Sequence, residues 1–156
     1  MTDLPISGVR LCFDVGLVRI GVAKCDRDQI LAVPVMTLRV DENCQSTIDD
    51  LIFEIEPAAI YVGLPINLQG NDTQSTESAI SFATSLAERL SAKTSQIEIR
   101  LVDERLSTSS ALGSLRDSGK TAKQSKEIVD QAAAVEILEL ALAIEKRTFA
   151  LAGTKI

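Results

Sequence analysis

The stretch LCFDVGLVRIGVAKCD, residues 11–26, decides how this fold begins. An apolar run ends at Asp14, Gly16 permits a tight turn, and a second apolar run follows at 19–25. This pattern predicts two antiparallel strands, with the Asp14 carboxylate at the end of the first. Burying a lone carboxylate is costly, so Asp14 needs a cation, a hydrogen-bond donor or a metal ion as its partner. That partner is not a histidine, because the chain contains none.

Beyond this hairpin, apolar runs alternate with helical patterns. Because strands alternate with helices after residue 44, the first, fourth and fifth strands should run parallel through right-handed crossovers. We predict an α/β fold with a five-stranded mixed sheet of order 3-2-1-4-5, strand 2 antiparallel to strand 1, and helices on both faces. Residues 1–156 fit a single domain. The expected strands are 8–14, 19–25, 30–37, 59–65 and 97–103, and the expected helices are 44–56, 73–92, 107–119 and 127–146, with a basic connector at 120–126.

The composition favours a cytoplasmic globular protein. Hydrophobic residues make up 46% of the chain and aromatic residues only 3%, so aliphatic side chains must build the core. No run approaches the roughly 18 apolar residues of a membrane span, and the N-terminal MTDLPISGVR lacks the features of a signal peptide. The three cysteines lack CxxC spacing, which favours buried reduced thiols over a metal or redox site; they are Cys12, Cys25 and Cys44.

The charge is unevenly distributed along the chain. A net charge of −6 argues against a protein that coats nucleic acid nonspecifically. Residues 89–126 nevertheless carry eight basic and four acidic side chains, a local charge of +4. This segment is compatible with one phosphate-binding face, although charge alone favours an ordinary solvated surface.

Further acidic residues are predicted to meet Asp14. Asp103 ends the strand at 97–103 and Glu104 follows it, and the carboxyl ends of parallel strands share one edge of an open α/β sheet. Asp130 falls in the middle of the apolar stripe of its helix, where a helix built only for packing would carry Ala or Leu. The alternatives are a polar loop and helix cap for Asp103 and Glu104, and an interaction with the helix N-terminus for Asp130.

These carboxylates predict a site for a hard cation. Since the chain offers neither histidine nor a suitable thiolate, the oxygen ligands favour Mg²⁺ or Mn²⁺. Two such ions would replace a histidine base, because one lowers the pKa of an attacking water and the other stabilises the leaving oxygen of an in-line phosphoryl displacement.

Four ordered blocks together carry a family resemblance. They are FDVGLVRIGVAKCD, IYVGLPINLQG, VDERLST and KEIVDQAAAVEILE. Over residues 8–145 the chain resembles the YqgF/RuvX family of pre-16S rRNA nucleases, also described as Holliday-junction-resolvase-like. The resemblance implies a ribonuclease H-like fold of three α/β/α layers. It also implies nucleic-acid phosphodiester hydrolysis that processes the 5′ end of pre-16S rRNA during ribosome biogenesis.

The resemblance also implies roles for particular residues. Asp14, Glu104 and Asp130 would be the catalytic metal-binding acids, with Asp103 beside them as a further ligand of Mg²⁺ or Mn²⁺. The expected partner is structured RNA, namely pre-rRNA, or branched DNA, and the oligomeric state stays open, with a homodimer as one alternative. The residues expected to bind nucleic acid are Arg19, Arg105, Arg116, Lys120, Lys123 and Lys126.

One departure from the family pattern bears on activity. The family usually has Thr-Lys where this chain has Leu17 and Val18, so a hydroxyl and a positive charge are lost beside the site. Two alternatives to the rRNA nuclease stay open, a non-catalytic RNA-binding assembly factor and a DNA four-way-junction resolvase. A nucleotide phosphotransferase of the actin-like kind is disfavoured, because the chain is too short for the second domain that this class needs.

Overall fold

The structure is a computed structural model that describes residues 6–66, 73–93, 96–106 and 122–156, with side chains of the last segment described from Lys126 onward. Within these ranges the strands form one mixed sheet of order β3-β2-β1-β4-β5-β6. The expected helix at 107–119 lies outside the described residues. The strands are β1 (Arg10–Val15), β2 (Arg19–Cys25), β3 (Ala32–Arg39), β4 (Ala59–Leu64), β5 (Glu98–Asp103) and β6 (Thr154–Lys155).

The strand directions confirm the predicted topology. β2 is antiparallel to β1 and to β3, whereas β4 is parallel to both β1 and β5. The prediction of five strands is wrong, because β6 adds a sixth strand antiparallel to β5. β6 has only two residues, both exposed, so it carries none of the apolar alternation from which a strand is recognised.

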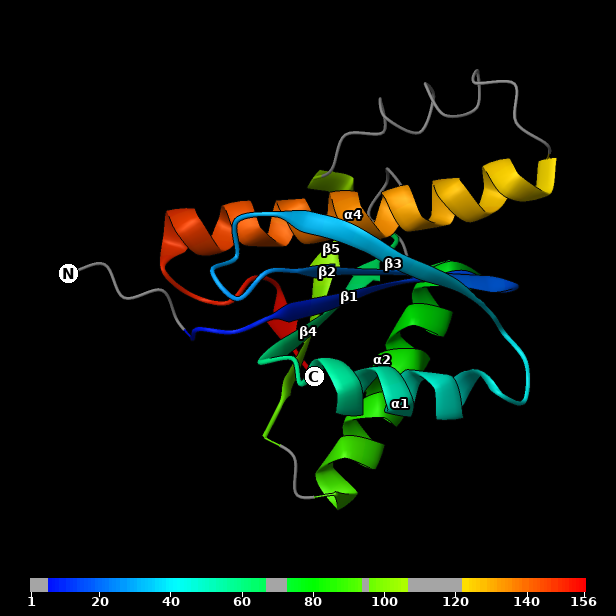
Figure 1. Ribbon diagram of the computed structural model, residues 1–156, viewed down its shortest axis with the longest axis horizontal. Coiled ribbons are helices and arrows are strands. Elements are labelled where there is room, and N and C mark those ends of the chain that lie inside the picture. Colours follow the sequence, from blue (N-terminus) through cyan, green and yellow to red (C-terminus); the bar gives the residue numbers. More distant parts are fainter. Residues whose placement is uncertain (1–5, 67–72, 94–95, 107–121) are drawn as a thin grey trace.

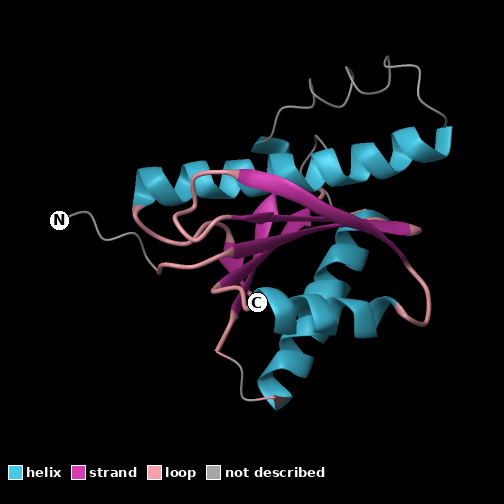
Figure 2. Cartoon of the chain, in the orientation of Figure 1, coloured by secondary structure: helices cyan, strands magenta, loops and turns pink. Residues whose placement is uncertain are grey.

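The sheet lies between two helical layers (Figures 1 and 2). Helix α4 (Ala122–Thr148) covers one face, and α1 (Cys44–Ile55) and α2 (Gln74–Ala92) cover the other. α4 begins at residue 122 rather than at the expected 127, because most residues of the supposed connector are good helix formers. Among the helices of the described ranges, none has the length and apolar character needed to span a bilayer.

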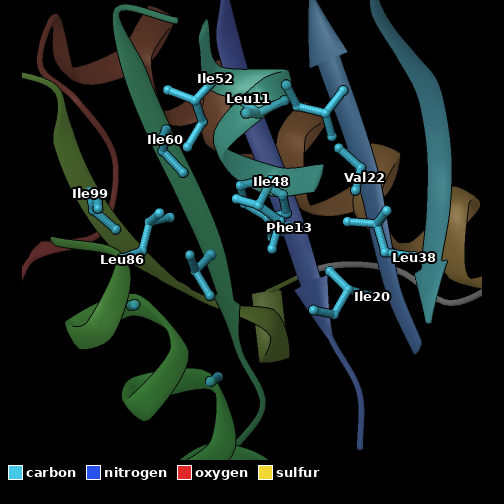
Figure 3. Packing of buried hydrophobic residues seen from close by; sticks show 14 of the residues in the cluster. Leu11, Phe13, Ile20, Val22, Leu38, Ile48, Ile52, Ile60, Leu86 and Ile99 are labelled. Carbon is cyan, nitrogen blue, oxygen red and sulfur yellow. The ribbon is translucent and has the colours of Figure 1, made fainter. Parts of the chain in front are cut away.

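Each face of the sheet has its own core. On the α1 and α2 face, Leu11 and Phe13 of β1 pack with Ile48 of α1 and Leu86 of α2 (Figure 3). On the α4 face the buried residues are smaller, with Cys12 and Ala23 of the sheet against alanines of α4. The strand alternation therefore points Asp14, like Cys12, toward α4.

A glycine brings α4 against the sheet at the position of Asp130. Gly21 of β2 is the residue paired with Asp14 of β1. A Cβ atom added to Gly21 would collide with the backbone carbonyl oxygen of Asp130. Only a residue without a side chain fits there, so backbone contact fixes the distance between Asp130 and the β1–β2 hairpin.

The two edges of the sheet are irregular. On β3, Pro34 pairs with Ala23 and Met36 pairs with Val22, so that Val35 is an extra residue that forms a bulge. At the other edge, the two residues of β6 cover only part of β5, where Lys155 pairs with Arg100.

A buried ion pair joins the sheet to the far end of α4. The Arg10 guanidinium donates to Glu145 through Nε, 2.9 Å from Oε1, and both side chains are almost fully buried, with 0% and 1% exposed. The Tyr61 hydroxyl also donates to Glu145, and the backbone N–H of Ala152 donates to that hydroxyl. Nη2 of Arg10 donates to Oε2 of Glu145 and to the backbone carbonyl oxygen of Ile6, and Nη1 donates to that of Gly8, so the guanidinium is fully hydrogen-bonded.

Candidate active site

The structure brings Asp14 and Glu104 together across the sheet. Asp14 lies near the carboxyl end of β1, and Glu104 opens the 3₁₀ turn η1 (Glu104–Leu106) directly after β5. β4 separates these two strands, yet the two carboxyl groups share a hydrogen bond. Gly63 of β4 makes this possible, because a Cβ atom at that position would collide with Oε1 of Glu104.

The shared environment changes the acidity of both groups. Burial raises the pKa of Glu104 to about 8, and the neighbouring charge of Asp14 adds to this effect. Burial also raises the pKa of Asp14, with a further increase from the charge of Asp130, while the hydrogen bond from Glu104 opposes it. At neutral pH the proton therefore resides on Glu104, and the protonated Glu104 donates a hydrogen bond to the Asp14 carboxylate.

Asp130 lies close to this pair but is held by an arginine. Its Oδ2 atom is 2.7 Å from Nε of Arg19, the first residue of β2. Both side chains are half-buried, and Asp130 is near enough to Asp14 to affect its titration. Asp130 thus faces the sheet at the predicted edge, as its position in the apolar stripe of α4 indicated.

Asp103 is paired with an arginine of the same turn. Both of its carboxylate oxygens accept hydrogen bonds from Arg105, the shortest being 2.6 Å to Nη2. This contact lowers the pKa of Asp103. Asp103 and Arg105 therefore neutralise each other at the surface rather than meeting Asp14.

The candidate carboxylates are suitable ligands for a hard cation, but in this structure they do not converge on a single point. No group of three or more His, Cys, Asp or Glu side chains within the described ranges is placed to hold a metal ion together. The reason lies in the partners, since Glu104 keeps a proton and Arg19 holds Asp130. The nearby Cys12 thiol is buried and its pKa is raised by that burial, so the ligands on offer are carboxylate oxygens, which suit Mg²⁺ or Mn²⁺.

The expected nucleic-acid contacts are only partly visible. Arg19 and Lys126 line a small cavity on the α4 face, and Arg105 is exposed beside Asp103. Arg116, Lys120 and the Lys123 side chain lie outside the described residues. At the hairpin tip Leu17 and Val18 are more than half exposed, so apolar surface does replace the usual Thr-Lys.

A larger cavity, of about 580 Å³, opens on the opposite face of the sheet. It lies between the β1–β2 turn and helices α1 and α2, and its lining includes Leu17, Ser81 and Arg89. None of the four candidate acids lines it. The predicted chemistry therefore belongs to the α4 face and not to this cavity.

Comparison with known proteins identifies the family of the chain. A family model described as "RuvX: Holliday junction resolvase" matches residues 8–144. The chain belongs to the RuvX family. A relative from Leifsonia xyli subsp. xyli, named "Putative pre-16S rRNA nuclease", is 46% identical over 144 residues, which cover 91% of this chain and 90% of the relative. A relative of the same name from Mycobacterium bovis is 43% identical over 153 residues, which cover 97% and 86%.

The RuvX chain also shares its fold with solved resolvase structures. T. thermophilus RuvC in complex with a Holliday junction substrate superposes with a TM-score of 0.55 at 13% identity, covering 96% of this chain and 99% of RuvC. The yeast mitochondrial Holliday junction resolvase Ydc2 gives a TM-score of 0.54 at 10% identity, covering 94% and 83%. At such identities the likeness concerns the fold, and it confirms the predicted ribonuclease H-like architecture.

Sequence reasoning did not single out one basic residue that lies near the candidate site. Arg39 of β3 pairs directly with Arg19 of β2 and lines the same small cavity as Lys126. A signal was present, because Arg39 ends an apolar strand much as Asp14 does. The expected strand at 30–37 stopped two residues short of it, whereas β3 runs to Arg39.

The raised pKa of Glu104 predicts a pH dependence of stability. Without metal, folded Glu104 keeps its proton to about pH 8, whereas the unfolded chain releases it near its ordinary value of 4.5. The folded state then binds more protons between pH 5 and 8, so the free energy of unfolding falls as pH rises through this window. Because Glu104 is partly exposed, we expect the free energy of unfolding to fall by on the order of 2 kcal/mol across this window, which is less than the whole pKa shift would give.

Urea unfolding in chelator at pH 5, 6.5 and 8 measures this slope. The Glu104→Gln variant is the control, because its amide does not titrate and its slope should be flatter than that of the parent. Equal slopes for the two proteins would contradict the shared proton.

Proposed function

We propose that the chain is a metal-dependent nuclease that hydrolyses phosphodiester bonds in the precursor of 16S rRNA. The observation that carries this proposal is the Asp14–Glu104 pair, in which an acid of β1 and an acid of the turn after β5 share a hydrogen bond near Asp130. Membership of the RuvX family and the names of its relatives support the reaction and the substrate. Ribosome assembly would place this activity in the cytoplasm.

Asp14, Glu104 and Asp130 would hold one or two Mg²⁺ or Mn²⁺ ions, with Asp103 as an outer ligand. When bound, such ions lower the pKa of an attacking water and stabilise the leaving oxygen of the cleaved phosphodiester. The protein's own part is to hold the acids at the end of the sheet. Glu104 must release its proton to become a ligand, and Asp130 must separate from Arg19.

The basic residues around the acids would position the RNA. Arg19 and Lys126 lie on the α4 face beside Asp130, where a negatively charged backbone would otherwise be repelled by the acids. We include Arg105, Arg116, Lys120 and Lys123 in this surface on the strength of the sequence.

Cleavage assays on two substrates test the proposal. The purified chain is incubated with a structured RNA that carries the 5′ end of pre-16S rRNA, and with a four-way DNA junction, each with Mg²⁺, Mn²⁺ or chelator. We expect metal-dependent cleavage of the RNA and little cleavage of the junction. Cleavage of the junction alone would replace the proposal with a resolvase, and RNA binding without cleavage would replace it with an assembly factor.

A further inference from the structure

On the face that packs against α4, paired residues of β1, β2 and β3 form rows across the sheet, and one of these rows contains Asp14. In this row Asp14 of β1 pairs with Gly21 of β2, which pairs with Thr37 of β3. In the next row, toward the hairpin tip, Arg19 pairs with Arg39. At about 4.8 Å per strand, β3 lies roughly 10 Å from β1, so the backbone of Arg39 is two strands away from that of Asp14.

Two arginines face each other in this second row. Like charges directly opposite one another on a sheet destabilise it, so the Arg19–Arg39 pair has an energetic cost. Lys126 of α4 adds a third positive charge to the same cavity of about 100 Å³. Arg19 is neutralised by Asp130, and Glu127 also lines the cavity, so the lining keeps an excess of positive charge.

The floor of this cavity is fixed by hydrogen bonds between β3 and α4. The Thr37 hydroxyl donates to the backbone carbonyl of Glu127, at 2.9 Å, and accepts from Nε2 of Gln131, at 3.1 Å. These contacts hold Lys126 over the end of β3. The basic groups are therefore positioned by the packing of α4 on the sheet.

We propose that Arg19, Arg39 and Lys126 form a binding site for a phosphate of the nucleic-acid backbone that is not the one cleaved. Because Asp130 already neutralises Arg19, the phosphate would supply a negative charge for Arg39 and Lys126, and it would fix the strand relative to Asp14 and Glu104. The proposal rests on the nuclease function, because it assigns this cavity to the same substrate. Arg39 is its diagnostic residue, since it lies on β3, two strands away from Asp14 in the sheet.

Binding of a fluorescein-labelled structured RNA, measured in chelator at several salt concentrations, tests the site without cleavage. Arg39→Gln should weaken binding roughly 5- to 20-fold at 0.1 M salt, as for the loss of one charge-assisted hydrogen bond. The slope of log Kd against log salt should fall by about 0.7 to 0.9, the value for one lost phosphate contact. Arg39→Lys, which keeps a charge, should restore the slope and part of the affinity.

Arg27→Gln is the matched control, because Arg27 is an exposed arginine in the turn at the other end of β2. It removes the same charge and should leave the slope unchanged. Thermal unfolding should show Arg39→Gln to be at least as stable as the parent, since the like-charge pair is relieved. With metal present, Arg39→Gln should raise KM and leave kcat nearly unchanged, as expected for a contact made equally before and during reaction.

The outcomes separate this site from the nuclease proposal. Equal salt slopes for Arg39→Gln and Arg27→Gln would overturn the phosphate site, even if the parent cleaves RNA. A parent that binds RNA through Arg39 but cleaves none would overturn the nuclease function and leave the phosphate site standing.

Discussion

Replacing Asp14 with Asn is expected to reduce metal-dependent RNA cleavage by at least about 10² to 10³-fold, the scale seen when one preorganised electrostatic contact to a transition state is lost. Asn keeps the shape of Asp14 but carries no charge for a metal ion. RNA binding in chelator should change little, because the basic cavity lies on β2, β3 and α4. Cleavage rates with Mg²⁺ and Mn²⁺, together with Kd in chelator, check both expectations.

The same substitution should raise stability when metal is absent. Asp14 is a buried carboxylate near the charged Asp130, and removing its charge relieves both the cost of its burial and the repulsion from Asp130. We expect the free energy of unfolding at pH 7 to rise by about 1 kcal/mol, a typical gain for a stabilising substitution. The control is Asp28→Asn, the same chemical change at an exposed turn position, which should alter neither cleavage nor stability. Undiminished cleavage by Asp14→Asn would falsify the catalytic assignment.

The largest loss of stability is expected from the buried ion pair. Arg10→Met should lower the free energy of unfolding by about 3 to 5 kcal/mol, because it leaves the Glu145 carboxylate buried without its cation. The Tyr61 hydroxyl still donates to Glu145 but cannot neutralise its charge. Urea unfolding at pH 7 measures the loss, and the double variant Arg10→Met/Glu145→Leu should recover much of it, because no isolated charge remains.

A matched surface pair provides the reference for this measurement. Lys93 lies 3.5 Å from Asp49 and is 62% exposed, so Lys93→Met should cost less than about 1 kcal/mol. Similar losses for Lys93→Met and Arg10→Met would show that burial does not determine how much stability is lost when the Arg10–Glu145 pair is broken. Cleavage by folded Arg10→Met should be retained, because Glu145 is 15 residues, or about 22 Å, along α4 from Asp130.

The sheet could be predicted because its signals are local. Each long strand is an apolar run bounded by turn residues, and chain order with crossover rules then gives the pairing. The two-residue β6 has no such pattern, since its pairing depends on backbone contacts with Arg100 and Leu101 more than fifty residues earlier. The start of α4 was placed too late, because polar helix formers look the same in a connector and in a helix.

In the candidate site, too, local patterns could be predicted from the sequence and long-range partners could not. Helical periodicity placed Asp130 on the core-facing stripe, and the structure brings it to Arg19. The same periodicity brings Glu145 back to within about 60° of Asp130, so its burial was open to prediction. Its partner was not, because Arg10 lies 135 residues away in sequence. That Asp103 bonds Arg105 instead of joining Asp14 follows from side-chain packing, which spacing does not specify.

The irregular edges of the sheet bear on how this protein avoids aggregation. A long regular edge strand offers unpaired N–H and C=O groups to any other chain, and it can seed intermolecular β-structure. On β3, Pro34 lacks the N–H that a docking strand would need, and the bulge at Val35 breaks the spacing of the remaining groups. At the opposite edge, β6 covers part of β5 with only two residues and carries Lys155. Pro34, the bulge and the lysine at the end of β6 therefore disfavour the addition of a strand from another copy at these positions of the two edges.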